Sequence, residues 1–313
     1  VADHLRREAF DTAFIQSLVL DEFDKSLEIG FEGEMRDILH ALPGVGRKIL
    51  TSATQGVEIP RFVGLKSPQV LDFLEDKISQ LQVKKVVSPT KDKLETLRQL
   101  LGQLGSKNGI IFCNFKDSIQ RVSESLSDRG ISYGIFSGGM EQIDRERSLI
   151  KFRNGTYPLL LATDLAARGI DVPELDFIIH YHLPLRAEEF IHRNGRTARM
   201  NSEGTAYILQ YEKEPLPDFV GRPALEKLLP STLPAPSAWS TLLISGGRKD
   251  KISKGDIAGF FLKQGGIQSD ALGAIELKTD CAFVAVKSVV LEQLLSKVNN
   301  QKLKEKKVRI SLI

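Results

Sequence analysis

Residues 158–171 read PLLLATDLAARGID, in which an apolar run is followed at once by a threonine, an aspartate and a glycine-containing turn. A short apolar run bounded by polar residues is typical of a buried strand, and parallel sheets are built from such strands. The polar residues after the run stand where α/β proteins bind ligands, at the carboxyl end of a strand. Outward from this stretch, helical and apolar patterns alternate, which favours a parallel α/β fold.

The alternation predicts a complete α/β domain around this stretch. Its expected strands are 109–113, 132–136, 158–162, 177–180 and 204–209, and its expected helices are 93–104, 117–129 and 142–153. Before this domain, a second parallel sheet is indicated by apolar runs at 17–20, 48–50 and 69–73 and a helical pattern at 31–42. We therefore expect two α/β units in succession.

A different pattern occupies the end of the chain. Six prolines fall within residues 213–237, which disfavours regular structure and indicates a linker. Beyond it we expect strands at 241–244, 274–277, 281–286 and 307–312, and helices at 254–263, with Ser253 as N-cap, and 290–298. The order βαββαβ is that of a ferredoxin-like sandwich, the topology of RNA-recognition modules.

Composition and charge narrow the class of protein. Of 313 residues, 42% are apolar and 27% charged, as in ordinary soluble globular proteins, and the apolar runs are too short to cross a bilayer. We therefore expect a cytoplasmic protein without a membrane partner, and Cys113 and Cys281 as reduced core thiols. Residues 238–313 carry 13 Lys and Arg against 7 Asp and Glu, which indicates either a polyanionic partner or a solvated face.

Three acids follow the first apolar run, in LVLDEFD at residues 18–24. In a nucleotide hydrolase, Asp21 would hold Mg²⁺ through water, and Glu22 would orient or deprotonate the attacking water. The alternative is an acidic helix N-terminus. Thr51–Thr54 follows the next run, so its hydroxyls either bridge these acids to another domain or form an ordinary capped turn.

Two arginines stand three apart in HRNGRTAR, residues 192–199. On a helix, Arg196 and Arg199 would share one face and could converge on a triphosphate to stabilise its charge. Arginines at this spacing also form ordinary surface salt bridges. The glycine and threonine beside Arg196 and the His-Arg pair before it favour the triphosphate hypothesis.

In this order and at these spacings, the acidic motif, Ser52-Ala53-Thr54, residues 163–171 and His192–Arg199 resemble the DEAD-box ATP-dependent RNA helicases. The resemblance covers about residues 1–212. It implies an incomplete RecA-like domain at 1–80, a complete RecA-like domain at 81–212, the linker at 213–237 and an RRM-like domain at 238–313. The resemblance also implies ATP and Mg²⁺ as cofactors.

The resemblance implies a role for each matching residue. Asp21 and Glu22 would act on magnesium and water, His192, Arg196 and Arg199 would complete the catalytic set, and Gly169 and Asp171 would contact the nucleotide. Asp24, Ser52 and Thr54 would couple hydrolysis to strand separation. Gly138, Thr163 and the Gln-x-x-Arg element, Gln142 and Arg145, would lie on the RNA side.

Two departures from the family pattern matter. Phe23 stands where the family has alanine, which changes local packing, and no GxxxxGK[ST] loop occurs anywhere in the chain. Because Val1–Leu5 resembles the residues directly after the family's Thr-Pro-Gly-Arg element, we expect the chain to begin inside the first helicase domain. We then expect it to be inactive alone, and the alternative to a helicase is a non-enzymatic RNA-binding adaptor.

Residues 247–257 with 282–286 and 307–310 resemble the C-terminal RNA-binding domain of the DbpA-type bacterial helicases. That resemblance implies a monomer that acts on ribosomal RNA within assembly intermediates of the large ribosomal subunit. Only Phe283 is left to stack a base on the sheet, since Leu243 and Cys281 hold the other stacking positions. Contacts to RNA phosphates are expected from Arg248, Lys249, Lys251, Lys304, Lys306 and Lys307, which could also be solvated surface residues.

Overall fold

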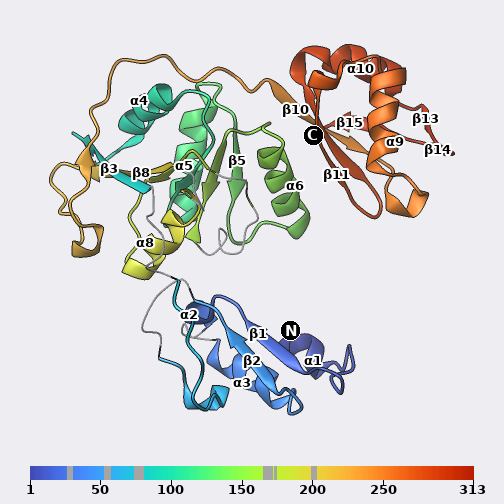
Figure 1. Ribbon diagram of the computed structural model, residues 1–313. Coiled ribbons are helices and arrows are strands. Elements are labelled where there is room, and N and C mark those ends of the chain that lie inside the picture. Colours follow the sequence, from blue (N-terminus) through green and yellow to red (C-terminus); the bar gives the residue numbers. More distant parts are fainter. Residues whose placement is uncertain (27–30, 53–57, 74–80, 165–171, 173–174, 199–202) are drawn as a thin grey trace. The chain divides into compact units, whose positions relative to one another are not determined.

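The computed structural model describes residues 1–26, 31–52, 58–73, 81–164, 172, 175–198 and 203–313 (Figure 1). The chain falls into two compact units, Val1–Ile78 and Ser79–Ile313. Among the described helices, none has the length and apolarity that a bilayer crossing requires.

The first unit is built on two parallel strands, β1 (Ser17–Leu20) and β2 (Arg47–Leu50). Its remaining described elements are α1 (Ala2–Arg6), α2 (Phe23–Ser26), α3 (Glu32–His40) and the 3₁₀ turn η1 (Arg61–Val63). The core is small and consists of Leu20, Phe23, Met35 and Val63, with partly buried neighbours. These few side chains fix the turn after β1.

The strand expected at 69–73 is wrong. The run has no regular structure, pairs with no described strand, and leaves Val70, Leu71 and Phe73 at 79%, 69% and 66% exposure. An apolar run becomes a strand only where a neighbour supplies its ladder of hydrogen bonds, and the apolar pattern alone carries no information about that neighbour.

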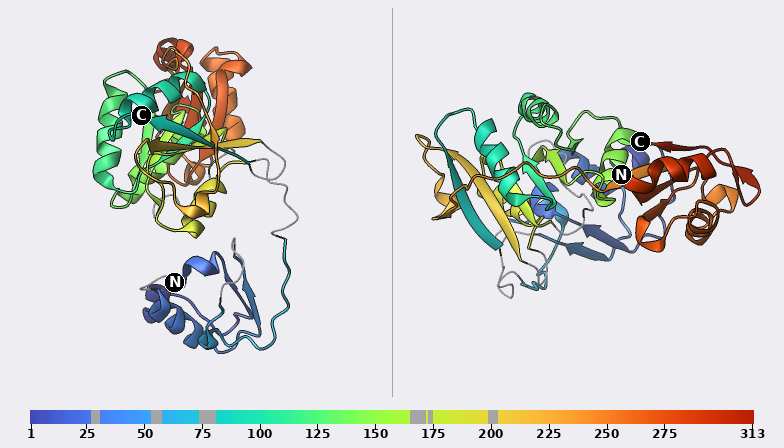
Figure 2. Two further views of the ribbon diagram at one scale, coloured as in Figure 1. Left: turned by 90° about the vertical axis from the view of Figure 1, so that its left-hand side faces the viewer. Right: turned by 90° about the horizontal axis from the view of Figure 1, so that it is seen from above.

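The second unit begins with a seven-stranded sheet in which every neighbouring pair is parallel, in the order β5-β6-β4-β7-β8-β3-β9. The twist of this sheet can be followed in Figure 2. The strands are β3 (Leu81–Ser88), β4 (Gly109–Phe112), β5 (Tyr133–Phe136), β6 (Leu159–Ala162), β7 (Phe177–His180), β8 (Gly204–Tyr211) and β9 (Ala224–Leu225). The helices are α4 (Leu94–Leu104), α5 (Lys116–Ser127), α6 (Gln142–Arg153) and α8 (Ala187–Asn194).

The central strands are apolar because both of their faces are covered. All four residues of β4, β6 and β7 are buried, and α4 and α5 pack over one side of the sheet. The sequence pattern missed β3, whose central Lys84 and Lys85 interrupt the apolar run. Lys84 is accommodated by an ion pair with Glu226 at 2.9 Å, beside β9.

The last domain is a four-stranded antiparallel sheet in the order β11-β12-β10-β15. Its strands are β10 (Trp239–Ile244), β11 (Leu272–Leu277), β12 (Ala282–Lys287) and β15 (Ile310–Leu312), and a hairpin joins β13 (Lys302–Leu303) to β14 (Lys306–Lys307). Helices α9 (Lys254–Gly259), continued by a π-turn, and α10 (Leu291–Val298) pack on one face (Figure 1). Ser253 caps α9, accepting from the Asp256 backbone N–H at 3.2 Å.

The fold class is therefore confirmed: a small parallel sheet, a RecA-like parallel sheet and a small α+β domain with the RRM strand order. Within the second unit, the last domain contacts the end of α6. The buried Thr241 hydroxyl bonds Asn154 Nδ2 at 3.2 Å and Thr156 Oγ1 at 2.7 Å. Arg153 pairs with Glu276 at 2.7 Å, so the face of the sheet opposite α9 and α10 lies against the helicase-like domain.

Candidate nucleotide and RNA sites

The hydroxyl group of Thr51, directly after β2, holds the acidic turn that follows β1. Thr51 Oγ1 donates to Asp21 Oδ1 and accepts from the Glu22 backbone N–H at 3.3 Å. The Phe23 N–H donates to the Thr51 carbonyl at 2.8 Å. Glu22 takes a left-handed backbone conformation, with φ of 48°, which costs energy in any residue with a side chain. Thr51 therefore fixes the placement of both acids.

These acids suit a cation held through water. Asp21 is exposed and Glu22 half-buried, at the carboxyl end of a parallel strand. Among the described residues, no cluster of three or more acidic, His or Cys side chains could coordinate a metal directly. Mg²⁺ characteristically keeps several waters and takes one or two carboxylates together with substrate phosphates. The pair Asp21 and Glu22 fits that requirement.

A buried guanidinium organises the second unit's site. Arg193, 2% exposed, donates from Nε and Nη2 to the two oxygens of Asp164, each at 2.5 Å. It also donates to the His182 carbonyl at 2.6 Å and to Asn114 Oδ1 at 2.8 Å. We call these four residues the Arg193 clamp. It joins the carboxyl ends of β4, β6 and β7 to the last turn of α8.

Two imidazoles beside Arg193 are kept neutral mainly by burial. Burial, and then the Arg193 charge, lower the pKa of His180 to about 3, and its Nε2 lies 3.0 Å from Asn194 Oδ1. Burial, Lys93 and Arg193 lower the pKa of His182 to about 4. Both rings are therefore neutral at pH 7, so Arg193 carries the positive charge here.

Arg196 does not lie on a helix, which corrects the expected shared helical face with Arg199. Helix α8 ends at Asn194, and Gly195 follows as its C-cap. Thr197 then donates its hydroxyl to the Leu175 carbonyl and forms a bridge with that residue, which draws the chain out of helical conformation. Arg196 is half-buried in this turn, while Arg199 falls outside the described residues.

The residues expected on the RNA side follow two adjacent strands. Thr163 comes directly after β6, and Gly138 lies between β5 and α6. Phe136 and Ala162, the last residues of these strands, are register partners. Gln142 begins α6 and is exposed, and Arg145 lies over the Phe136 ring at 4.8 Å. The fold thus brings these residues to one edge of the sheet.

The basic residues of the last domain gather where a 3₁₀ turn, η3 (Arg248–Asp250), meets the β13–β14 hairpin. Lys304 donates to the Lys251 carbonyl at 2.6 Å. Ion pairs join Lys306 to Asp250 at 2.8 Å, Lys304 to Asp256 at 2.7 Å, and Lys249 to Asp280. Lys304 and Ser253 hold the Asp256 pKa at about 2.

Three cations of this basic cluster are not committed to a carboxylate. Arg248, Lys251 and Lys307 are exposed and take part in no ion pair recorded within the described part of the chain. Phe283, in contrast, is 4% exposed and pairs in register with Leu243 and Glu276 on the sheet. It offers no ring face to a base in this arrangement, because that side of the sheet lies against the helicase-like domain.

Comparison with known proteins identifies two families that match parts of this chain. Residues 92–201 match the family model of the helicase conserved C-terminal domain, and residues 241–312 match the DbpA RNA binding domain. ATP-dependent RNA helicase DbpA of Escherichia coli is 30% identical over 99% of this chain and 70% of its own length. The chain belongs to the DbpA family of DEAD-box RNA helicases. The Bacillus subtilis DbpA is 27% identical over 99% of this chain and 72% of its own length.

A solved structure described as S. cerevisiae Dbp5 bound to RNA and ADP BeF3 has a TM-score of 0.59 at 24% identity. It covers 68% of this chain and 57% of its own, and it supports the fold alone. For this DbpA-family chain, the predicted resemblance is thus confirmed. The predicted roles of Thr54, Gly169, Asp171 and Arg199 fall on residues outside the described ones.

Three residues that organise the DbpA-family site escaped sequence reasoning. Thr51 belongs to the segment Thr51–Thr54, but the coupling role was predicted for Ser52, which is exposed, and for Thr54. Asn114, which follows the apolar strand β4, was not singled out, and Arg193 was noted only as part of the His-Arg pair before Arg196, without a role of its own. No helix was predicted over residues 187–194, so the sequence pattern offered no apolar helical face on which Arg193 would stand out as a charge that needs buried partners.

Proposed function

We propose that the protein couples hydrolysis of ATP with Mg²⁺ to the separation of short RNA duplexes, directed by its C-terminal domain to ribosomal RNA in assembling large subunits. The Arg193 clamp carries this proposal. It joins Asp164, next to Thr163 on the expected RNA side, to the helix that precedes Arg196, on the expected ATP side. The names of the DbpA relatives, ATP-dependent RNA helicases, support the same activity.

In the proposed reaction, Asp21 and Glu22 would hold Mg²⁺ through water, and the ion would neutralise charge on the β and γ phosphates. Gly169 and Asp171 would contact the nucleotide. Arg196 and Arg199 would stabilise the charge that develops during phosphoryl transfer, and His192, half-buried in the last turn of α8, would complete the catalytic set. Asp24, Ser52 and Thr54 would transmit hydrolysis to the RNA.

The RNA-binding part of the proposal rests on charge. Arg248, Lys251 and Lys307 present exposed cations beside three further lysines that are paired with carboxylates. Because Phe283 is buried, recognition would use phosphate contacts at the basic cluster and not base stacking on the sheet. These three cations could bind a phosphate without first giving up a carboxylate partner.

A second candidate function concerns the 313-residue chain by itself. No GxxxxGK[ST] loop occurs in its sequence. Without backbone amides and a lysine around the phosphates, the arginines have no positioned substrate. We propose that this chain alone binds RNA and does not turn over ATP.

The test is RNA-stimulated ATP hydrolysis, measured on this chain and on a chimera in which the first part of a DbpA relative precedes Val1. We expect hydrolysis by the chimera only, and a loss of about a thousandfold in kcat for Arg196→Ala. Arg186→Ala, an exposed arginine at the start of α8, is the matched control and should leave kcat unchanged. Hydrolysis by the chain alone would refute the second candidate, and a chimera that neither hydrolyses ATP nor binds RNA would refute the first.

A further inference from the structure

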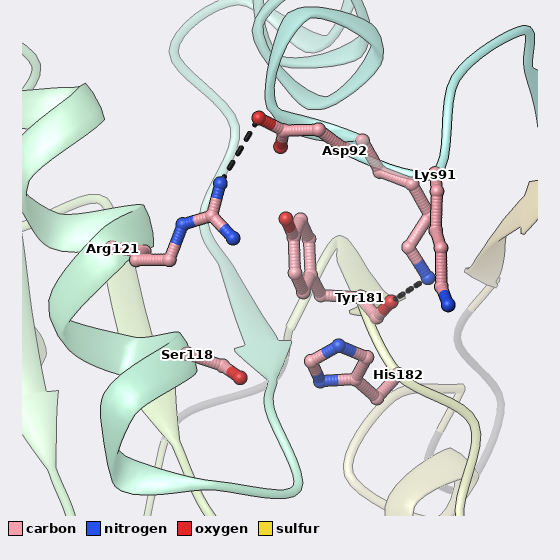
Figure 3. A pocket seen from close by; sticks show the side chains of 7 residues that line it. Lys91, Asp92, Ser118, Arg121, Tyr181 and His182 are labelled. Carbon is pink, nitrogen blue, oxygen red and sulfur yellow. Dashed lines mark hydrogen bonds and ion pairs between the residues drawn. The ribbon is translucent and has the colours of Figure 1, made fainter.

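A hollow of about 390 Å³ lies beside the carboxyl ends of β4 and β7 (Figure 3), and of its lining residues only His182, through its backbone carbonyl in the Arg193 clamp, has a role assigned above. Three chain segments line it: Lys91 and Asp92 after β3, Ser118 and Arg121 on α5, and Tyr181 and His182 after β7. Its volume is within the range of small-ligand sites. We call it the Lys91 pocket.

An exposed ion pair between Arg121 and Asp92 lies across the mouth of the Lys91 pocket. Arg121 Nη2 lies 3.0 Å from Asp92 Oδ2, and the two side chains are 64% and 52% exposed. Beneath them the Tyr181 hydroxyl points toward the pair, and Ser118 projects from α5 on the same side as Arg121 (Figure 3). Exposed ion pairs contribute little stability, so an incoming anion can take the Arg121 guanidinium from Asp92 at small cost.

The charge balance of the pocket is positive. Lys93 is buried below it, donates to the carbonyls of Tyr181 and, at 3.0 Å, Leu209, and lies 5.1 Å from the Tyr181 ring centre. Together with Lys91 and Arg121 it supplies three cations, against the single carboxylate of Asp92, among the lining residues. The pocket therefore attracts an anion small enough to enter it, and a phosphate ester meets that description.

An exposed aromatic ring stands beside the pocket. Phe115, which precedes α5, is 66% exposed, and its ring centre lies 6.2 Å from that of His182 at an interplanar angle of 62°. His182 is neutral at pH 7, since its pKa is lowered to about 4. An aromatic platform next to clustered cations is how proteins hold single-stranded nucleic acid, stacking a base and binding the adjoining phosphate.

The pocket continues the edge that carries the expected RNA-side residues. Along the sheet the order is β5-β6-β4-β7, so the carboxyl ends present Gly138, Thr163, Phe115 and Tyr181 in turn. Neighbouring strands are roughly 5 Å apart, so each step is short compared with a nucleotide chain. A strand of RNA lying on Gly138 and Thr163 therefore reaches Phe115 next and then the pocket.

We propose that the Lys91 pocket binds one nucleotide of single-stranded RNA, with its base against Phe115 and His182 and its phosphate on Lys91 and Arg121. The proposal rests on the RNA-binding function proposed above and adds a specific subsite to it. Arg121 moves from Asp92 to the phosphate when RNA enters. The pocket then holds a strand beyond the Gly138 and Thr163 edge.

The experiment uses the full chain and a labelled uridine decamer, with affinity measured by fluorescence anisotropy over a range of salt concentrations. Lys91→Ala should weaken binding and reduce the salt slope by about 0.7, the value for one lost phosphate contact on single strands. Phe115→Ala should weaken binding about tenfold with the slope unchanged, because stacking is not a counterion effect. Lys107→Ala, an exposed lysine before the amino end of β4, is the matched control.

Photo-crosslinking of the same decamer, mapped by mass spectrometry, locates the contact at residues 115 and 181–182. If the wild-type chain does not bind the decamer, the proposed RNA-binding function and the pocket fail together. If it binds and both pocket variants match Lys107→Ala, the pocket assignment alone is overturned. If ATP or inorganic phosphate removes the crosslink better than unlabelled RNA at equal phosphate concentration, the site belongs to a free nucleotide or ion, which also overturns the proposal.

Discussion

At the scale of single residues, Arg193 shows how a buried charge can hold several loops of a site together. Its planar guanidinium reaches three targets at once: Asp164, the His182 carbonyl and Asn114. A lysine has one ammonium group and cannot reproduce this fork. Each target lies at the carboxyl end of a different strand, so the orientation of Thr163 and of the turn holding Arg196 depends on one side chain.

Removing Arg193 should therefore destabilise the second unit. We expect Arg193→Ala to lower its free energy of unfolding by about 3 kcal/mol, because Asp164, with 26% exposure, keeps its charge and loses its partner. Arg193→Lys should recover only part of this loss. The measurement is urea unfolding followed by hydrogen exchange in the peptides of β4, β6 and β7. An Arg193→Ala protein as stable as Arg186→Ala would contradict the clamp.

At the scale of elements, the turn between β1 and α2 depends on an unusual core residue. Phe23 is 2% exposed and packs with Leu20, Met35 and Val63, whereas the DEAD-box pattern has alanine there. Phe23→Ala should cost about 3–5 kcal/mol, since the small core around it has little with which to fill the cavity. Hydrogen exchange in residues 1–26 measures the effect. Phe14→Ala, at 86% exposure, is the control and should change stability by less than about 0.5 kcal/mol.

The sequence predicted those elements whose pattern follows from local burial. Strands β4, β6 and β7 are buried throughout, so unbroken apolar runs identify them. The pattern failed where a partner distant in sequence decides the outcome. Strand β3 contains Lys84, whose charge is paired with Glu226, a residue far away in the sequence. The run at 69–73 lacks such a partner among the described strands, and Arg196 leaves the helical course because Thr197 bonds the Leu175 carbonyl.

In the candidate site, too, local pattern identified some residues, while contacts between residues distant in sequence were missed. Asp21, Glu22 and Thr163 could be found because each comes after an apolar strand, whereas Gln142 was assigned through its match to the family's Gln-x-x-Arg element. The contacts from Thr51 to Asp21 and from Arg193 to Asp164, next to Thr163, join residues 30 and 29 positions apart, and periodicity carries no information at that range. The stacking role predicted for Phe283 assumed an open sheet face. Burial of that face depends on another domain, which a single domain's pattern does not record.

At the scale of the whole second unit, buried hydrogen bonds and partly exposed ion pairs hold the last domain to the helicase domain. Thr241 is fully buried between Asn154 and Thr156, while the Arg153–Glu276 pair and a Lys278–Glu146 pair at 2.6 Å are partly exposed. Partly exposed ion pairs are screened by salt, whereas buried hydroxyl contacts are not. The contact between the two domains should therefore be strong at low salt and weaker, although not lost, at high salt.

Trp239 reports on this attachment because it is the sole tryptophan in the sequence and lies at the junction. Its ring packs close to Gly155 of the helicase domain and Gly273 of β11. Arg153→Glu should place like charges opposite each other, separate the domains and shift Trp239 emission to longer wavelength. The double variant Arg153→Glu with Glu276→Arg should restore only part of the wild-type spectrum, with a coupling energy of about 1 kcal/mol, because Lys278 also pairs with Glu276 at 2.6 Å and would face the new arginine.

Lys263→Glu, a charge reversal at an exposed position in the same domain, is the control and should leave the emission unchanged. Raising the salt concentration should move the wild-type spectrum part of the way toward that of Arg153→Glu, since only the ion pairs are screened. A spectrum that is identical in Arg153→Glu and wild type would mean that Trp239 stays packed without the ion pair. Thr241 and its two partners would then hold the domain alone, and Thr241→Val, which removes both hydrogen bonds, should release it.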